Sequence, residues 1–92
     1  YTLTYADQGK FIYVTSSSQT ITIPDNSVTP LPVGAVVNIV TSAQAATITT
    51  ATDTLILGGV GTVGSRTLGS YGMATVMKVA PTTWYISGAG VS

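Results

Sequence analysis

The chain of 92 residues contains no cysteine and no histidine, and its only acidic residues are Asp7, Asp25 and Asp53. These absences exclude a disulfide scaffold, zinc sites built on cysteine and histidine, and catalytic devices that need a thiol or an imidazole. Charged residues make up 7% of the chain, against about 25% in an ordinary globular domain. Because the three basic and three acidic residues cancel, we expect neither nucleic-acid binding nor a polybasic membrane-surface segment.

The residues that are abundant are threonine, valine, isoleucine, serine and glycine. Side chains branched at Cβ pack well on a pleated surface, so this composition favours strands. A chain that is 45% apolar and weakly charged is unlike a disordered one. No apolar run approaches the roughly 20 residues that cross a bilayer, so no membrane insertion is expected. The composition predicts one all-β domain over residues 1–92, smaller than most domains.

Short apolar runs separated by turn residues predict a small antiparallel β-sandwich or barrel-like domain of about seven to nine strands, with no helix. The strands are expected at residues 2–5, 10–16, 19–23, 33–42, 45–50, 53–57, 73–79 and 84–87. The run 33–42 is predicted to be the longest and most buried. Gly9 is expected in a turn with positive φ, and Pro24 is expected to end a strand because it has no N–H to donate. No internal repeat is evident.

The aromatic residues supply the candidate core and the candidate surface contacts. Phe11 and Trp84 are predicted to be core side chains. Trp84 and Tyr85 are neighbours on one strand, so their side chains point to opposite faces and Tyr85 faces solvent or a partner. The candidate surface or partner contacts are Asp25, Asn26, Tyr71 and Tyr85.

The small size of the domain raises a problem of stability. A chain of this length buries only about 60–65% of the surface that its unfolded form exposes, and no disulfide or metal compensates. A net charge of zero and a 45% apolar composition favour association. We therefore expect part of the apolar surface to lie in a permanent oligomer interface. A monomer with a hydroxyl-rich surface is the alternative.

The glycines of residues 59–64 match the pattern G-x-G-x-x-G. A dinucleotide site would also need a helix beginning at this loop and an acidic residue about 20 positions further on. Residues 65–70 do not resemble a helix, and no acidic residue follows Asp53. We therefore predict that residues 58–64 form a loop and that the chain binds no cofactor.

The three aspartates are expected in turns, where the side chain accepts hydrogen bonds from nearby backbone. Catalysis by paired carboxylates needs two of them across a cleft, one with a raised pKa, and Asp7 with Asp53 is the pair that comes closest. Calcium would need a cluster of aspartates such as D-x-D-x-D. A serine–lysine nucleophile with Lys10 or Lys78 lacks the S-x-x-K spacing. We predict no catalytic residues, no metal and no enzymatic activity.

Five short motifs follow one another along nearly the whole chain. They are an aspartate-x-glycine-lysine turn at 7–10, T-I-P at 22–24, P-V-G at 32–34, G-x-Y-x-x-A-T at 69–75 and W-x-x-x-G at 84–88. This succession resembles a small β-rich module of tailed-bacteriophage virion proteins, chiefly tail fibres and tail spikes. One departure is that Ala89 follows the closing Gly88, where an acidic residue is expected.

The resemblance implies a non-enzymatic virion component, homotrimeric, made in the host cytoplasm and exposed on the phage particle. In a tail fibre or spike, the loops 25–32 and 58–64 with exposed tyrosines would meet a host-surface glycan, and the fibre shaft would be the neighbouring protein. The alternative is a capsid decoration or cement protein, in which the same loops touch the major capsid protein. A second alternative is a monomeric carbohydrate-binding module, which a flat row of exposed aromatic side chains on one sheet would support.

Overall fold

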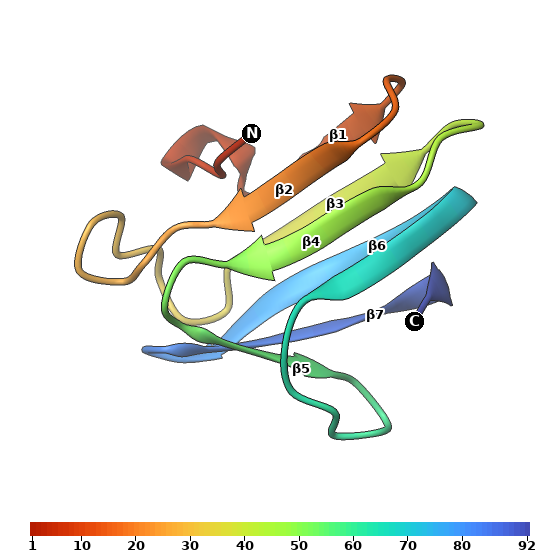
Figure 1. The fold of residues 1–92 in the computed structure, drawn as a ribbon. Helices are drawn as coiled ribbons and strands as arrows, with labels where there is room; N and C mark the ends of the chain where they lie inside the picture. The colour runs from red at the N-terminus through yellow and green to blue at the C-terminus, as the bar shows by residue number, and fades with distance from the viewer.

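The computed structural model describes all residues 1–92 and consists of seven strands and one short 3-10 helix. The elements are η1 (Tyr5–Asp7), β1 (Phe11–Val14), β2 (Gln19–Ile23), β3 (Val36–Thr41), β4 (Ala46–Thr50), β5 (Thr54–Leu57), β6 (Arg66–Ala80) and β7 (Thr83–Val91). Figure 1 shows that the strands form a curled sheet, a half-barrel. The predicted all-β class, the number of strands and the barrel-like shape are confirmed. The protein contains no helix that could span a bilayer.

The sheet has two wings that share the long strand β6. The first wing contains β1, β3, the C-terminal half of β6, β7 and β5. The second wing contains β2, β4 and the N-terminal end of β6. In Figure 1, β2 and β4 lie in front of β1 and β3. Three of the six strand pairs, β1–β3, β2–β4 and β5–β7, are parallel, so the predicted antiparallel pairing is wrong for half of the sheet.

The two parallel pairs β1–β3 and β2–β4 arise from a repeat of 27 residues. Phe11 pairs with Asn38 and Gln19 pairs with Ala46, 27 residues further along in both cases. The turns 15–18 and 42–45 have the same length, so the segment β1–turn–β2 stacks in register on β3–turn–β4. We call these two segments the arch stack. In the sequence, this repeat is visible mainly as the matching T-I-T segments at 20–22 and 47–49. Three matching residues are too few to identify a repeat from the sequence alone.

A bend in β6 allows this strand to serve both wings. The pairing of β6 with β7 shifts register within residues 68–73, where Tyr71 has a φ of 55°. A Cβ at Gly72 would lie 2.5 Å from the Leu68 side chain. The Gly72 N–H donates to Thr41 Oγ1 at 2.8 Å, and the Tyr71 N–H donates to the Ser42 carbonyl at 2.7 Å. The arch stack therefore holds the bend in place.

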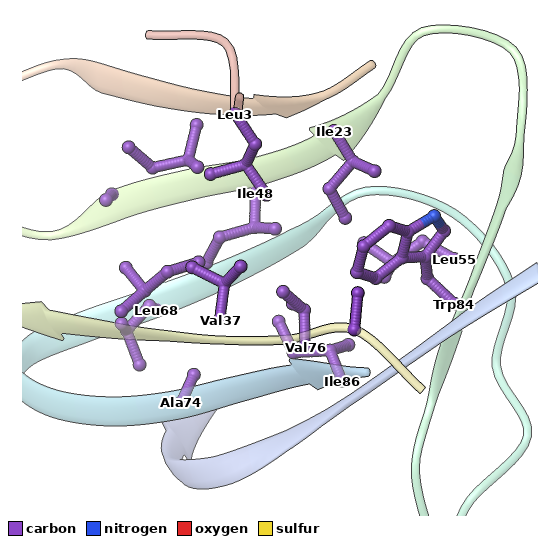
Figure 2. Close-up of a cluster of buried hydrophobic side chains, with 14 of the residues drawn as sticks. Leu3, Ile23, Val37, Ile48, Leu55, Leu68, Ala74, Val76, Trp84 and Ile86 are labelled. Atoms are coloured by element: carbon purple, nitrogen blue, oxygen red, sulfur yellow. The ribbon is translucent and has the colours of Figure 1, made fainter. Parts of the chain in front are cut away.

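The core consists of 16 buried apolar side chains between the two wings. Figure 2 shows Ile23 and Ile48 of one wing pointing toward Val76 of the other. Trp84 is a core residue as predicted, with 1% of its surface exposed, whereas the exposed fraction of Tyr85 is 47%. The prediction for Phe11 is wrong, because its side chain is 65% exposed.

Burial along β1 explains the error. The strand alternates, and its inward positions are Ile12 and Val14, so Phe11 points to the other face. Residues 19–23 form a strand as predicted, and its Ile21 and Ile23 side chains are buried. Pro24 follows the end of this strand and is itself buried.

Several predicted strand boundaries are wrong. Residues 2–5 make only an isolated bridge at Thr2 before η1 begins. The run 33–42 is shortened to β3 because Gly34, with a φ of 95°, lies in a turn. The run 10–16 is likewise shortened to β1. The longest strand is instead β6, which starts at Arg66, and β7 continues past Ser87 to Val91. The predicted positive φ of Gly9 is confirmed at 72°.

Candidate functional site

The convex side of the first wing carries two rows of apolar side chains. Cross-strand partners share a face of a sheet, and the register places Tyr13 beside Val40 and Val40 beside Met73. Met77 pairs in the same way with Tyr85. We call this surface the outer face; its exposed large side chains are Phe11, Tyr13, Met73, Met77 and Tyr85.

The outer face contains polar side chains but no charged one. Between the aromatic residues lie Asn38, Thr75 and Ser87, which pair across β3, β6 and β7. The Thr75 hydroxyl donates to Asn38 Oδ1 at 2.7 Å. Lys78, the one charged residue of β6 beyond its first position, is buried on the opposite side. Exposed apolar patches are a common feature of interaction sites, so the outer face is a candidate interaction surface.

Two of the three edge strands of the sheet are covered by the chain itself. The N-terminal residues lie along β2, where the Leu3 N–H donates to the Thr22 carbonyl at 2.9 Å. Along β5, the Leu57 N–H donates to the Thr62 carbonyl at 2.8 Å. Both edges are therefore paired with loop backbone, which removes free donors and acceptors.

The third edge, β1, is uncovered. The carbonyls of Lys10 and Val14 accept hydrogen bonds from Asn38 and Ser42, on the side of β3. Backbone groups alternate in direction along a parallel strand, so those of Phe11 and Tyr13 point away from β3. Their side chains belong to the outer face, so the open edge and the apolar surface are continuous.

A second candidate site lies inside the fold, where Lys78 meets the loop 24–35. Only 2% of the Lys78 surface is exposed. Its Nζ donates to Asn26 Oδ1 and to the Leu31 carbonyl, both at 2.6 Å. Lys78 is in phase with the inward-facing Ala74 and Val76. The period of two along this strand therefore contained the signal for its burial, which sequence reasoning missed.

Two carboxyl groups complete this site. Asp25 accepts hydrogen bonds from the hydroxyls of Ser27 and Thr52, and these bonds lower the pKa of Asp25 to about 2. Asp53 is buried, and its Oδ2 accepts from the Asn26 N–H at 3.2 Å. Burial raises the pKa of Asp53, and the neighbouring Asp25 carboxylate raises it further. We call Asp25, Asn26, Asp53 and Lys78 the polar cluster.

The carboxylates that come together are not Asp7 and Asp53, the pair that comes closest to a catalytic pair in the sequence. Asp53 is paired with Asp25, whereas Asp7 lies at the N-terminus and accepts from the Tyr1 hydroxyl at 2.7 Å and the Thr4 N–H at 2.8 Å. Burial raises the pKa of Asp7, but these hydrogen bonds outweigh it and the net pKa is lowered. Asp7 therefore holds the first turn, as its predicted position in a turn suggested.

The two carboxyl groups of the polar cluster do not line a cleft. The pKa of Asp25 is lowered and that of Asp53 is raised. No pocket opens on the protein surface, so these two side chains do not face a substrate cleft. No three carboxylates lie close enough to hold a metal ion. The loop 58–64 joins β5 to β6, so a strand rather than a helix follows its glycines.

The four predicted surface contacts lie in different environments. Tyr85 belongs to the outer face, and Tyr71 is 78% exposed at the bend of β6. Asp25 and Asn26 are half-buried members of the polar cluster. The structure therefore separates two tyrosines on the surface from two loop residues that hold an internal site.

A scan against protein-family models found no match, and neither did searches of curated proteins and of solved structures. The function is accordingly argued from the geometry of the outer face and of the polar cluster.

Proposed function

We propose that this chain is a non-enzymatic structural module that assembles with copies of itself through the outer face. The observation that carries the proposal is the apolar character of both faces of one wing. The inner face already has a partner, because it packs on the second wing. The outer face has none within the chain, and its exposed methionine and aromatic side chains are residue types enriched at protein interfaces.

Charge favours a second copy as the occupant. The chain has a net charge of zero, so copies of it do not repel one another over long distances. No charged side chain of the outer face would have to be desolvated on contact. The open edge of β1 adds backbone donors and acceptors that a strand of another copy can use. A face of this chemistry suits a permanent interface.

The resemblance to phage virion modules gives this assembly its biological setting. A homotrimer in a tail fibre or spike would bury the outer faces near the three-fold axis and leave Tyr71 and the loop 58–64 free to meet a host-surface glycan. A capsid decoration protein would use the same features against the major capsid protein. The location on a virion is the part of the proposal that follows from the resemblance and not from the geometry.

The native mass of the protein tests the proposal. We expect a trimer by light scattering that persists on dilution. Met73→Lys and Met77→Lys each place a charge in the outer face, so we expect both variants to be folded monomers. Val60→Lys is the matched control, because Val60 is an exposed apolar residue of the loop 58–64, and it should remain trimeric. A wild-type protein that is monomeric at all concentrations contradicts the proposal.

One observation favours a second function, carbohydrate binding. Phe11 and Tyr13 lie two residues apart on β1 and point to the same side, with the amide of Asn38 beside Phe11. Aromatic rings next to a polar amide can bind a sugar face. If the wild type is a monomer, a glycan screen with Phe11→Ala and Tyr13→Ala decides this function, since binding should be lost in both variants.

A further inference from the structure

The buried amine of Lys78 and the side-chain amide of Asn26 meet across 52 residues of sequence. The distance from Nζ to Oδ1 is 2.6 Å. Since a C=O bond is about 1.23 Å long, Nζ lies within about 3.8 Å of Asn26 Cγ. Reacting atoms in near-attack geometries are about 3–3.5 Å apart, so a small movement brings the nitrogen to the carbonyl carbon.

We propose that Lys78 and Asn26 react to form an intramolecular isopeptide bond, with Asp53 carrying the protons. The site contains the three parts that this reaction needs, which are an amine, a primary amide and a carboxyl group, and the side chains of Lys78 and Asp53 are both buried. Both acceptors of Lys78 Nζ, Asn26 Oδ1 and the Leu31 carbonyl, are neutral. They compensate a buried ammonium less well than a carboxylate would. The proposal is independent of the proposed assembly function.

Asp53 is placed to act on the amide of Asn26. Its Oδ2 accepts from the main-chain N–H of Asn26 at 3.2 Å, so the carboxyl group lies beside the residue that reacts. It is also close enough to Lys78 for the ammonium charge to oppose the upward shift of its pKa. Burial and the Asp25 carboxylate nevertheless raise the pKa of Asp53, which strengthens it as a proton acceptor.

The reaction balances without an oxidant or any other reagent. The Lys78 ammonium gives one proton to the Asp53 carboxylate, and the neutral amine attacks Asn26 Cγ. The bond from Nζ to Cγ forms, and the bond from Cγ to Nδ2 breaks after Nζ has given a second proton to Nδ2. Asp53 returns its proton to the leaving ammonia, which departs as ammonium. The product is a secondary amide that joins the loop after β2 to the end of β6.

Mass spectrometry of the denatured protein tests the bond directly. We expect the wild type to be lighter than its sequence by one molecule of ammonia. Trypsin cleaves after lysine and arginine, and the acylated Lys78 should resist it. The digest should therefore contain residues 11–66 linked to residues 67–92, instead of free peptides 67–78 and 79–92. A wild type with the full sequence mass overturns the proposal.

Two variants and a control assign the roles. Lys78→Arg and Asp53→Asn should both have their full mass, with circular dichroism showing that they are folded. Lys10→Arg changes an exposed lysine and should keep the loss of ammonia. If ammonia is lost but trypsin still cleaves after Lys78, Asn26 has cyclised onto its own backbone and the proposal is wrong. If Asp53→Asn still forms the bond, Asp53 is not the proton carrier.

Discussion

The inner and outer faces of the first wing are built from the same strands, but the inner face is buried and the outer face is exposed. On β7, Trp84 is buried against the second wing, whereas its neighbour Tyr85 is exposed. On β6, Val76 is buried and the adjacent Met77 is exposed. Both faces are apolar, so hydrophobicity alone does not distinguish the core from the surface. The difference is that a second wing covers one face and nothing in the chain covers the other.

This comparison explains how so small a chain can be rich in apolar residues. The inner face supplies a closed core of 16 side chains, and the stability of the single chain depends on it. The outer face adds no packing within the chain, so its side chains can change without loss of the fold. Substitutions in the two faces should therefore separate stability from assembly.

The largest expected effect is that of Trp84→Ala. Removing a buried aromatic side chain costs about 3–5 kcal/mol, whereas an exposed substitution stays within about 0.5 kcal/mol. We expect Trp84→Ala to lose several kcal/mol of unfolding free energy and Tyr85→Ala almost none. Chemical denaturation measures both, with each variant made in the Met73→Lys background so that assembly does not contribute. Equal losses would show that the two faces do not differ.

Trp84→Phe sharpens the same comparison. The indole Nε1 of Trp84 is buried and has no hydrogen-bond partner, and an unsatisfied buried donor costs about 1–3 kcal/mol. Phenylalanine loses part of the buried area but also removes this donor. We expect Trp84→Phe to be far less destabilising than Trp84→Ala, and a loss as large as that of alanine would contradict this account.

An intermediate effect is expected for Gly88→Ala, which tests backbone packing in β7. Gly88 is in phase with Trp84, but its φ is 147°, and a Cβ there would lie 2.0 Å from the Met73 carbonyl oxygen. A strained backbone position costs about 1–3 kcal/mol, and the collision with β6 adds to it. We expect a drop in melting temperature larger than that of Gly61→Ala, whose φ is 90° in open space. Equal drops would show that backbone strain alone is responsible.

The smallest effect concerns Asp25, outside both faces. Its pKa falls from an ordinary 3.8 to about 2 in the folded protein, chiefly through the Ser27 and Thr52 hydroxyls. The folded state therefore favours the carboxylate, and the stabilisation is present above about pH 4 and is lost toward about pH 2. Asp25→Asn should destabilise the protein at pH 6, and denaturation curves of variant and wild type should converge near pH 2. A difference that does not change with pH would contradict this.

Local sequence rules predicted the features that depend on neighbouring residues. The strand at 19–23, the turn at Gly9 and the opposite directions of Trp84 and Tyr85 all follow from local backbone geometry. The same rules failed for Phe11, because alternation says that two residues point apart without saying which one is inside. They also missed the bend of β6, where the backbone N–H groups of the bend donate hydrogen bonds to Thr41 and Ser42.

The amino-acid sequence by itself determined that this protein is made of strands and turns, since β-branched residues and glycines act on the chain within a few positions. The tertiary structure alone decided which faces are covered, because burial depends on which wing packs on which. It also brought Lys78, Asn26 and Asp53 together from three distant segments. Residues so far apart in sequence meet only in the folded protein, where the arch stack and β6 pack on one common core.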